Sequence, residues 1–369
     1  MRPDKAVRGG ALDGLRFLAA MFIVIYHFGA SAPASLEQVS PLFARGWLAT
    51  DFFLILSGYV LGRAYGAGLD ARRIDMPGFV GRRLSRVWPG HVVILGGFVA
   101  LLVATSLVGI APNNPERFQG YELLAQLGLA HAWGVTAQAG WNEPSWTLSA
   151  LVVCYVAFPL AWSATRAMSG RARALVAAIA LLSAATVAAR VVFHHDLHNL
   201  PFQLGVFRAL PIFLCGLFLA RYVDRREPSR PLGFALLVSG VGLLAVIQAG
   251  PVSTLMGFVS ILCLAMIVLG SDQLSARGHV LVARAADLSF ALFISHALSG
   301  AVWFGLSALL AERLALSEPW LWVIWALAIP FALACAVAFQ KLIDDPVQAF
   351  IKARLDQRRE VITGHQHAH

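Results

Sequence analysis

Long apolar runs recur along the chain and decide what it can fold into. They lie near residues 14–33, 47–66, 91–110, 144–164, 173–193, 203–222, 231–249, 252–270, 287–311 and 319–343. A helix of roughly 18–25 apolar residues can cross the ~30 Å hydrocarbon core of a bilayer. Only 13% of the residues are charged, against ~25% in soluble domains. The sequence therefore predicts an all-α, multi-pass membrane protein with about ten transmembrane helices.

Arginine is concentrated in alternate loops between these runs. Residues 63–90, 165–173 and 221–230 are rich in arginine, whereas residues 111–143 and 194–199 are not. Because positively charged loops stay in the cytoplasm, we expect both termini on the cytoplasmic side. The same rule accounts for the net charge of +9 without a nucleic-acid partner.

No linker or shift in composition divides the chain, so we expect one membrane domain over residues 1–369. The first run is too long for a cleavable signal peptide, and no soluble domain is expected after the last run. Residues 354–369 are expected to form a disordered cytoplasmic tail. The cysteines lie inside apolar runs without metal-ligand spacing, so they are expected to pack as small apolar side chains and no metal site is predicted. They are Cys154, Cys215, Cys263 and Cys335.

The first run carries two ionisable residues, Arg16 and His27, in the stretch DGLRFLAAMFIVIYHF. Ionisable groups at membrane depth are costly, and each therefore marks a candidate functional site. Eleven residues turn a helix through about 1100°, so the two side chains share one face about 16 Å apart. Asp13 is placed to pair with Arg16. The alternatives are that Arg16 reaches the membrane interface and that His27 is hydrogen-bonded inside the helix bundle.

Three residues of the second and ninth runs are further candidates. Asp51, near the outer end of the second run, either caps a helix or orients a histidine or a substrate hydroxyl. Ser57 lies in the middle of that run beside Gly58, which favours close helix packing. His296 lies in the middle of the ninth run, where a packed histidine is more common than a catalyst.

The fourth run has an unusually polar outer end. Asn142, Trp146 and Ser149 lie there, and Tyr155 follows two turns later. This pattern suits a surface that meets a hydroxyl-rich ligand. It also suits helix packing and the aromatic belt of a membrane protein.

The segment FVGRRLSRVWPGH, residues 79–91, combines Arg82, Arg83 and Arg86 with apolar neighbours. This is typical of an amphipathic segment at the cytoplasmic face. One interpretation is an anchor to anionic lipid headgroups. The other is recognition of a phosphorylated cofactor by the guanidinium groups.

Taken together, these motifs resemble the membrane acyltransferase-3 family in its form without a fused soluble domain. The resemblance runs from Asp13 to Pro346. The motifs on which the resemblance rests are DGLR with His27, TDFFLILSGYVL, RRLSRVWP, PSWTLSALVVCYVAFP, DLSFALFISHA and DDPVQAF. The sequence departs from the family at Leu151, where many members have glutamate, at Ser295, where many have tryptophan, and at Asp344, which replaces a common glutamate.

The resemblance implies an O-acyltransferase in the bacterial inner membrane. Acetyl-CoA or another acyl-CoA would be the donor, with Arg16, Arg82, Arg83 and Arg86 as its binding residues. The acceptor would be a carbohydrate hydroxyl, as in exopolysaccharide modification or the biosynthesis of another surface glycan. His27, with Asp51, would be catalytic, and Ser57, Asn142, Trp146, Ser149, Tyr155 and His296 would bind the acceptor or support the site. The alternatives are a polytopic transporter or channel, and an inactive relative, which Leu151 leaves open.

Overall fold

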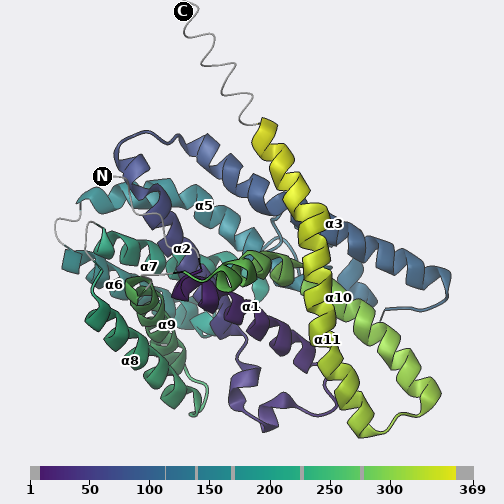
Figure 1. Ribbon diagram of the computed structural model, residues 1–369. Helices are drawn as coiled ribbons and strands as arrows, with labels where there is room; N and C mark the ends of the chain where they lie inside the picture. The colour runs from purple at the N-terminus through teal and green to yellow at the C-terminus, as the bar shows by residue number, and fades with distance from the viewer. Residues whose placement is uncertain are drawn as a thin grey trace, which may run out of the picture.

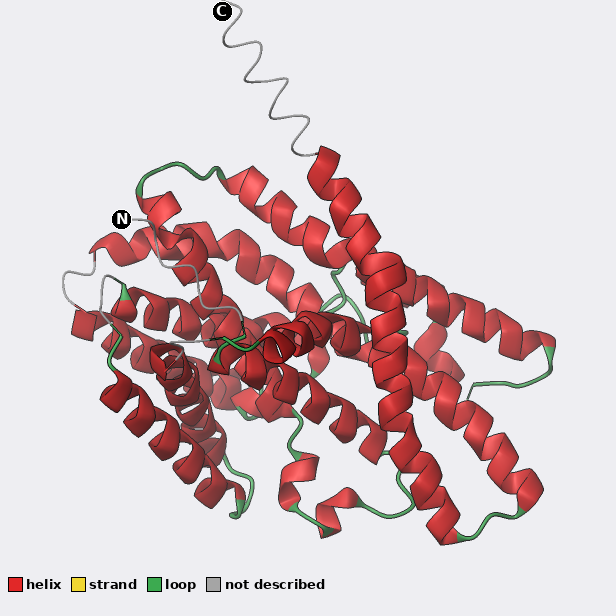
Figure 2. Cartoon of the chain, in the orientation of Figure 1, coloured by secondary structure: helices red, strands yellow, loops and turns green. Residues whose placement is uncertain are grey.

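The computed structural model describes residues 9–112, 114–137, 140–167, 171–224, 228–274 and 278–354. Within these residues the chain is helical and contains no strand (Figure 2). The helices are α1 (Ala11–Gly29), α2 (Trp47–Asp70), α3 (Met76–Leu107), α4 (Gly120–Leu127), α5 (Trp146–Ala164), α6 (Arg171–Val192), α7 (Gly205–Val223), α8 (Arg230–Gln248), α9 (Thr254–Leu274), α10 (Val280–Leu314) and α11 (Glu318–Phe339). A π-helical turn, Gln340–Asp344, extends α11, and helix continues to residue 354.

Ten helices of the described chain are long and apolar enough to cross a membrane, which confirms the predicted number of spans. Only α4, with 8 residues, is too short. The predicted tail lies outside the described residues, apart from Arg354, which still belongs to the last helix. The predicted 91–110 span is part of a longer helix, because α3 begins at Met76 and runs through Pro89. Its 32 residues span about 48 Å at ~1.5 Å each, so its arginine-bearing first turns extend beyond a bilayer core.

The helices form two groups with separate cores. One core is built mainly from α2, α5, α6, α7 and α9, and includes Ile55, Phe158 and Phe213. The other is built mainly from α1, α3, α10 and α11, and includes Val24 and Leu292. Figure 1 shows α6 to α9 gathered on one side of α1, and α3, α10 and α11 on the other. Residues of both α1 and α5 contribute to both groups, so these helices lie between the two.

Gly58 and Gly216 let α2 and α7 touch through their backbones. A Cβ atom added at Gly58 would lie 1.9 Å from the carbonyl oxygen of Phe213, and one added at Gly216 would lie 1.9 Å from that of Ile55. Small residues at such crossings allow the close approach that drives helix association in membranes. The expected packing role of Gly58 is therefore confirmed.

We expect Gly58→Ala to destabilise the protein, because the methyl group must push two backbones apart. The loss should reach or exceed the ~1–3 kcal/mol typical of an overpacked core. The measurement is the melting temperature of the purified protein in detergent. Gly96→Ala in α3 is the matched control, because its added Cβ would meet nothing within 4 Å. Equal melting temperatures for the two variants would show that the α2–α7 crossing is not tightly packed.

Candidate active site between α1 and α10

Arg16 and His27 both face α10. One guanidinium nitrogen of Arg16 donates a 3.0 Å hydrogen bond to the carbonyl oxygen of Ala286. The rings of His27 and His296 meet edge to face, with centroids 5.1 Å apart. The predicted shared face of α1 is therefore confirmed, and α1 and α10 run alongside each other in the same direction. Arg16 also lies 3.7 Å from Asp13, as the sequence predicted.

The contact between α1 and α10 is called the α1–α10 seam below. His296 has an unpaired ring nitrogen in this seam. Its side chain is fully buried, and its Nδ1 lies 2.8 Å from the carbonyl oxygen of Phe293. A carbonyl only accepts hydrogen bonds, so Nδ1 carries the hydrogen and Nε2 carries the lone pair. Among the described residues nothing bonds to Nε2. The neighbouring His27 ring is half-buried, so the pair combines a fixed imidazole with one that a substrate can reach.

The polar segment before α5 contacts α10 close to this pair. Asn142 is buried, and its amide nitrogen lies 3.4 Å from the carbonyl oxygen of Ile294, two residues before His296. Its backbone N–H donates to the side chain of Gln126 in α4. The Asn142 Oδ1 has no hydrogen-bond partner among the described residues. Asn142 therefore ties α4 to α10 next to the histidines and leaves one acceptor open.

Ser149 and Trp146, in the first turn of α5, contact two neighbouring segments. The Ser149 hydroxyl donates to the carbonyl oxygen of Leu129 and accepts from the N–H of Ala132, so it fixes the loop after α4. The ring of Trp146 lies 5.4 Å from the guanidinium carbon of Arg208, a distance suited to a cation–π contact. Ser149 thus contacts the loop after α4, and Trp146 contacts α7.

Asp51 pairs with Arg208, a residue that the sequence analysis did not single out. Its Oδ1 accepts bonds from two nitrogens of Arg208, at 2.8 and 3.1 Å, and both side chains are buried. Asp51 caps no helix, since α2 starts at Trp47 after Gly46. Its Oδ2 is buried without a partner among the described residues. A charged residue inside the predicted span 203–222 was the signal for Arg208.

Tyr155 and Ser57, two other candidates, lie further along their helices than Trp146 and Asp51. Tyr155 is buried nine residues along α5 from Trp146, about 14 Å at ~1.5 Å per residue. Ser57 is half-buried in α2, six residues beyond Asp51. Leu151, where many relatives carry glutamate, is buried among apolar residues of the core around α2, α5 and α7.

The three arginines of α3 have different surroundings. Arg83 donates to the hydroxyl of Tyr65 and lies against the rings of Tyr65 and Phe79. Arg86 uses one nitrogen, Nη1, to bind both carboxylate oxygens of Asp344, at 2.8 and 2.9 Å. The side chain of Asp344 is 5% exposed and that of Arg86 41% exposed. Arg82 is half-buried. Arg83 and Arg86 are thus anchored by aromatic and acidic partners, and Arg86 remains partly exposed.

A second buried polar cluster was not predicted. His91 of α3 and His131 of the loop after α4 are fully buried, with stacked rings 6.5 Å apart. Ser145 lies 3.2 Å from Nε2 of His131 and donates to the carbonyl oxygen of Asn142. Burial, with repulsion from His91, lowers the pKa of His131 to about 3, so its ring is neutral at pH 7. The only sequence signals were two histidines outside the recognised motifs.

No group of three or more histidine, cysteine, aspartate or glutamate side chains in the described residues is arranged to hold a metal ion.

A family of known proteins matches most of this chain. A family model described as an acyltransferase domain, of the acyltransferase-3 type, matches residues 10–339. Acyltransferase MdmB of Streptomyces mycarofaciens is 31% identical over 165 residues, which are 43% of this chain and 40% of that protein. Protein 2 in the picA locus of Rhizobium radiobacter is 35% identical over 102 residues, 27% of this chain and 48% of that protein.

A protein of Staphylococcus aureus (strain COL), provisionally named an O-acetyltransferase, is 25% identical over 161 residues, 40% of this chain and 24% of that protein. The chain thus spans less than half the length of each of these relatives. No solved structure matches it. The family model nevertheless covers all of the helices from α1 to α11. The chain is a multi-pass membrane protein that belongs to the acyltransferase-3 family.

Proposed function

We propose that the protein is an O-acyltransferase that moves an acyl group, with acetyl favoured, from cytoplasmic acyl-CoA to a carbohydrate hydroxyl. Exopolysaccharide or another cell-surface glycan is the acceptor class. The observation that carries the proposal is the seam between α1 and α10, where Arg16 and His27 face the same helix. Family membership supports the acyl-transfer chemistry.

The donor would bind at the arginine-bearing start of α3. Arg83 and Arg86 lie one helical turn apart on one side of the helix, and guanidinium groups suit phosphate oxygens. Asp344 binds only Nη1 of Arg86, whose side chain is 41% exposed, so the other nitrogens would make this contact. The acyl-pantetheine arm would then run along the seam, past Arg16 and towards His27. The rise of about 16 Å from Arg16 to His27 gives the arm room to lie extended.

The chemistry would take place at His27. A neutral imidazole accepts the proton of the acceptor hydroxyl. The hydroxyl oxygen attacks the thioester carbon, the carbon–sulfur bond breaks, and coenzyme A leaves as a thiol after taking up the proton. His296 would orient the His27 ring, because its own ring is held by the Phe293 carbonyl. The open oxygens of Asn142 and Asp51 would accept hydrogen bonds from the sugar.

The proposal is tested with membrane vesicles of known sidedness. Acetyl-CoA does not cross a bilayer, so transfer should occur in inverted vesicles, whose cytoplasmic face is outside, and not in sealed right-side-out vesicles. The readout is radiolabelled acetyl incorporated into vesicle glycans. Single cysteines in the loop between α2 and α3 (residues 71–75) and at exposed positions of α4 (residues 120–127), labelled with an impermeant thiol reagent, serve as the orientation control. Transfer from the opposite face would reverse the donor side, and no transfer from either face would reject the activity.

A further inference from the structure

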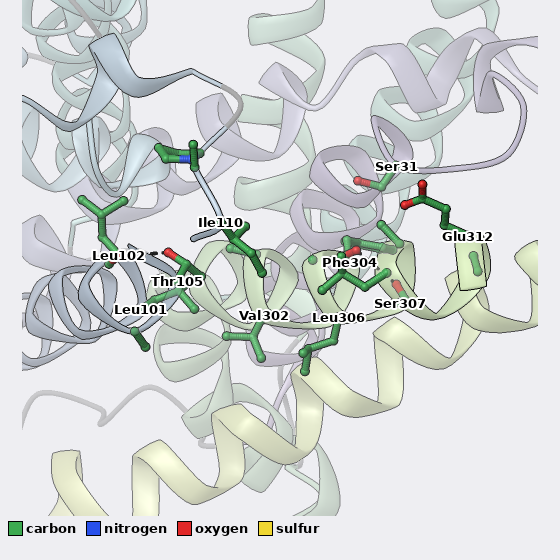
Figure 3. Close-up of a pocket in the computed structure, with 18 of the residues that line it drawn as sticks. Ser31, Leu101, Leu102, Thr105, Ile110, Val302, Phe304, Leu306, Ser307 and Glu312 are labelled. Carbon is green, nitrogen blue, oxygen red and sulfur yellow. Dashed lines mark hydrogen bonds between the residues drawn. The ribbon is translucent and has the colours of Figure 1, made fainter. Parts of the chain in front are cut away.

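A groove of about 1010 Å³ lies at the end of the bundle where α1 and α3 finish. Figure 3 shows Leu101, Leu102 and Thr105 of α3 on one side of it and Val302, Phe304 and Leu306 of α10 on another. The start of α11 contributes Ile324 and Trp325. The lining is predominantly apolar, and most of it comes from these three helices.

This groove adjoins the outer end of the α1–α10 seam. The indole N–H of Trp325 donates a 2.8 Å hydrogen bond to the carbonyl oxygen of Phe28, the residue after His27. The ring of Phe304 meets that of Phe28 edge to face, 5.2 Å apart. Ser31, just past α1, also lines the groove. The groove therefore lies next to Phe28, the residue that follows His27 in α1.

One wall of the groove carries exposed apolar side chains. Leu306 is 65% exposed and Leu309 40% exposed, and both belong to α10, which is long and apolar enough to cross a membrane. Exposed leucines on such a helix suit an apolar partner.

The groove also has a polar boundary. Arg117 lines it, with one nitrogen 2.6 Å from Glu143. No other hydrogen bond from its guanidinium to the described residues is found, and one third of its side chain is exposed. This leaves donors for a polar or anionic head group, beside Asn114. An apolar groove with a partly unpaired guanidinium at its boundary suits an amphiphile better than a free sugar.

We infer that the hydroxyl acceptor is an amphiphile whose aliphatic chain lies in this groove while its hydroxylated head reaches His27. The inference rests on the proposed acyl transfer for the identity of the head group. The groove itself is tested by binding, which needs no turnover.

Gly305 offers a direct way to fill the groove. It lines the groove, and a Cβ added there would meet nothing within 4 Å. Gly305→Phe should occupy the space that the chain needs without disturbing the helix. Gly96→Phe in α3 is the matched control, because it too has open space at its Cβ and does not line the groove.

The experiment uses the full chain in nanodiscs and a diazirine-bearing dodecyl β-D-glucoside as photoaffinity probe. Peptides of α3 and α10 that line the groove should be labelled in the wild type and in Gly96→Phe. Labelling should fall about tenfold in Gly305→Phe, which corresponds to losing about two buried methylene groups. Unlabelled dodecyl β-D-glucoside should compete, and methyl β-D-glucoside should not.

Three results would overturn the inference. Equal labelling in the two variants would mean that the probe only partitions into the bilayer. Labelling of other helices would place the chain elsewhere. Labelling by a diazirine phosphatidylcholine that the glucoside cannot displace would make this an ordinary lipid site. If groove labelling behaves as expected but no acetyl transfer occurs, the groove stands and the proposed reaction fails.

Discussion

Replacing His27 with alanine is expected to lower kcat by ~10²–10⁴-fold while leaving acyl-CoA affinity near the wild-type value. Losing a general base typically costs this much, whereas the donor contacts proposed at α3 are untouched. The measurement is steady-state acetyl transfer combined with an equilibrium binding assay for acetyl-CoA. In the wild type, kcat/KM should fall as pH decreases, because the base must be neutral to accept a proton. His27→Asn should lose that acidic limb along with the rate.

His195→Ala is the control, because His195 is exposed in the loop after α6. It should leave both transfer and its pH profile unchanged. If His27 and His296 act as one unit, the double alanine variant should be about as slow as His27→Ala alone, since residues of one catalytic unit are not additive. Wild-type transfer by His27→Ala would make His27 a packing residue and remove the proposed mechanism.

The sequence was sufficient for the features that depend on local order. Hydrophobic runs of membrane length identified ten spans, because a bilayer leaves few other ways to satisfy the backbone. Helical periodicity placed Arg16 and His27 on one face, and the structure sets that face against α10. Gly58 was recognised as a packing residue for the same reason, since small residues mark close crossings.

Partners far apart in the chain could not be predicted. Asp51 and Arg208 are 157 residues apart, and nothing in the local pattern of either shows that α2 and α7 bring them together. The sequence of residues 111–143 predicts only an arginine-poor loop between two spans. The structure folds part of that segment back as α4 and buries Gln126 and His131 beside the site. Such burial depends on the whole bundle, so it emerges only once the helices are placed.

The pairing of Arg86 with Asp344 leads to the second large effect. Asp344 is on the π-helical turn that extends α11, and irregular turns of this kind often occur at functional sites. Arg86→Gln removes one proposed phosphate contact and also leaves a buried carboxylate without its partner. Donor affinity should fall because a charge-assisted contact is worth about 1.5–3 kcal/mol, equivalent to about tenfold or more in Kd. The free energy of unfolding should fall as well. The loss should be smaller than for a fully buried ion pair, because Arg86 is partly exposed to solvent.

A second substitution separates these two effects. In Arg86→Gln/Asp344→Asn the buried charge is gone, so the melting temperature should recover towards that of the wild type. The Kd for acetyl-CoA should stay weakened, because the missing guanidinium is not replaced. Asp344→Asn alone should weaken donor binding less than Arg86→Gln, since the positive charge remains and only its orientation is lost. Isothermal titration with acetyl-CoA, beside thermal unfolding of each variant, measures both quantities. If donor affinity recovers together with stability in the double variant, Arg86 serves to join α3 to α11, and the phosphates bind elsewhere.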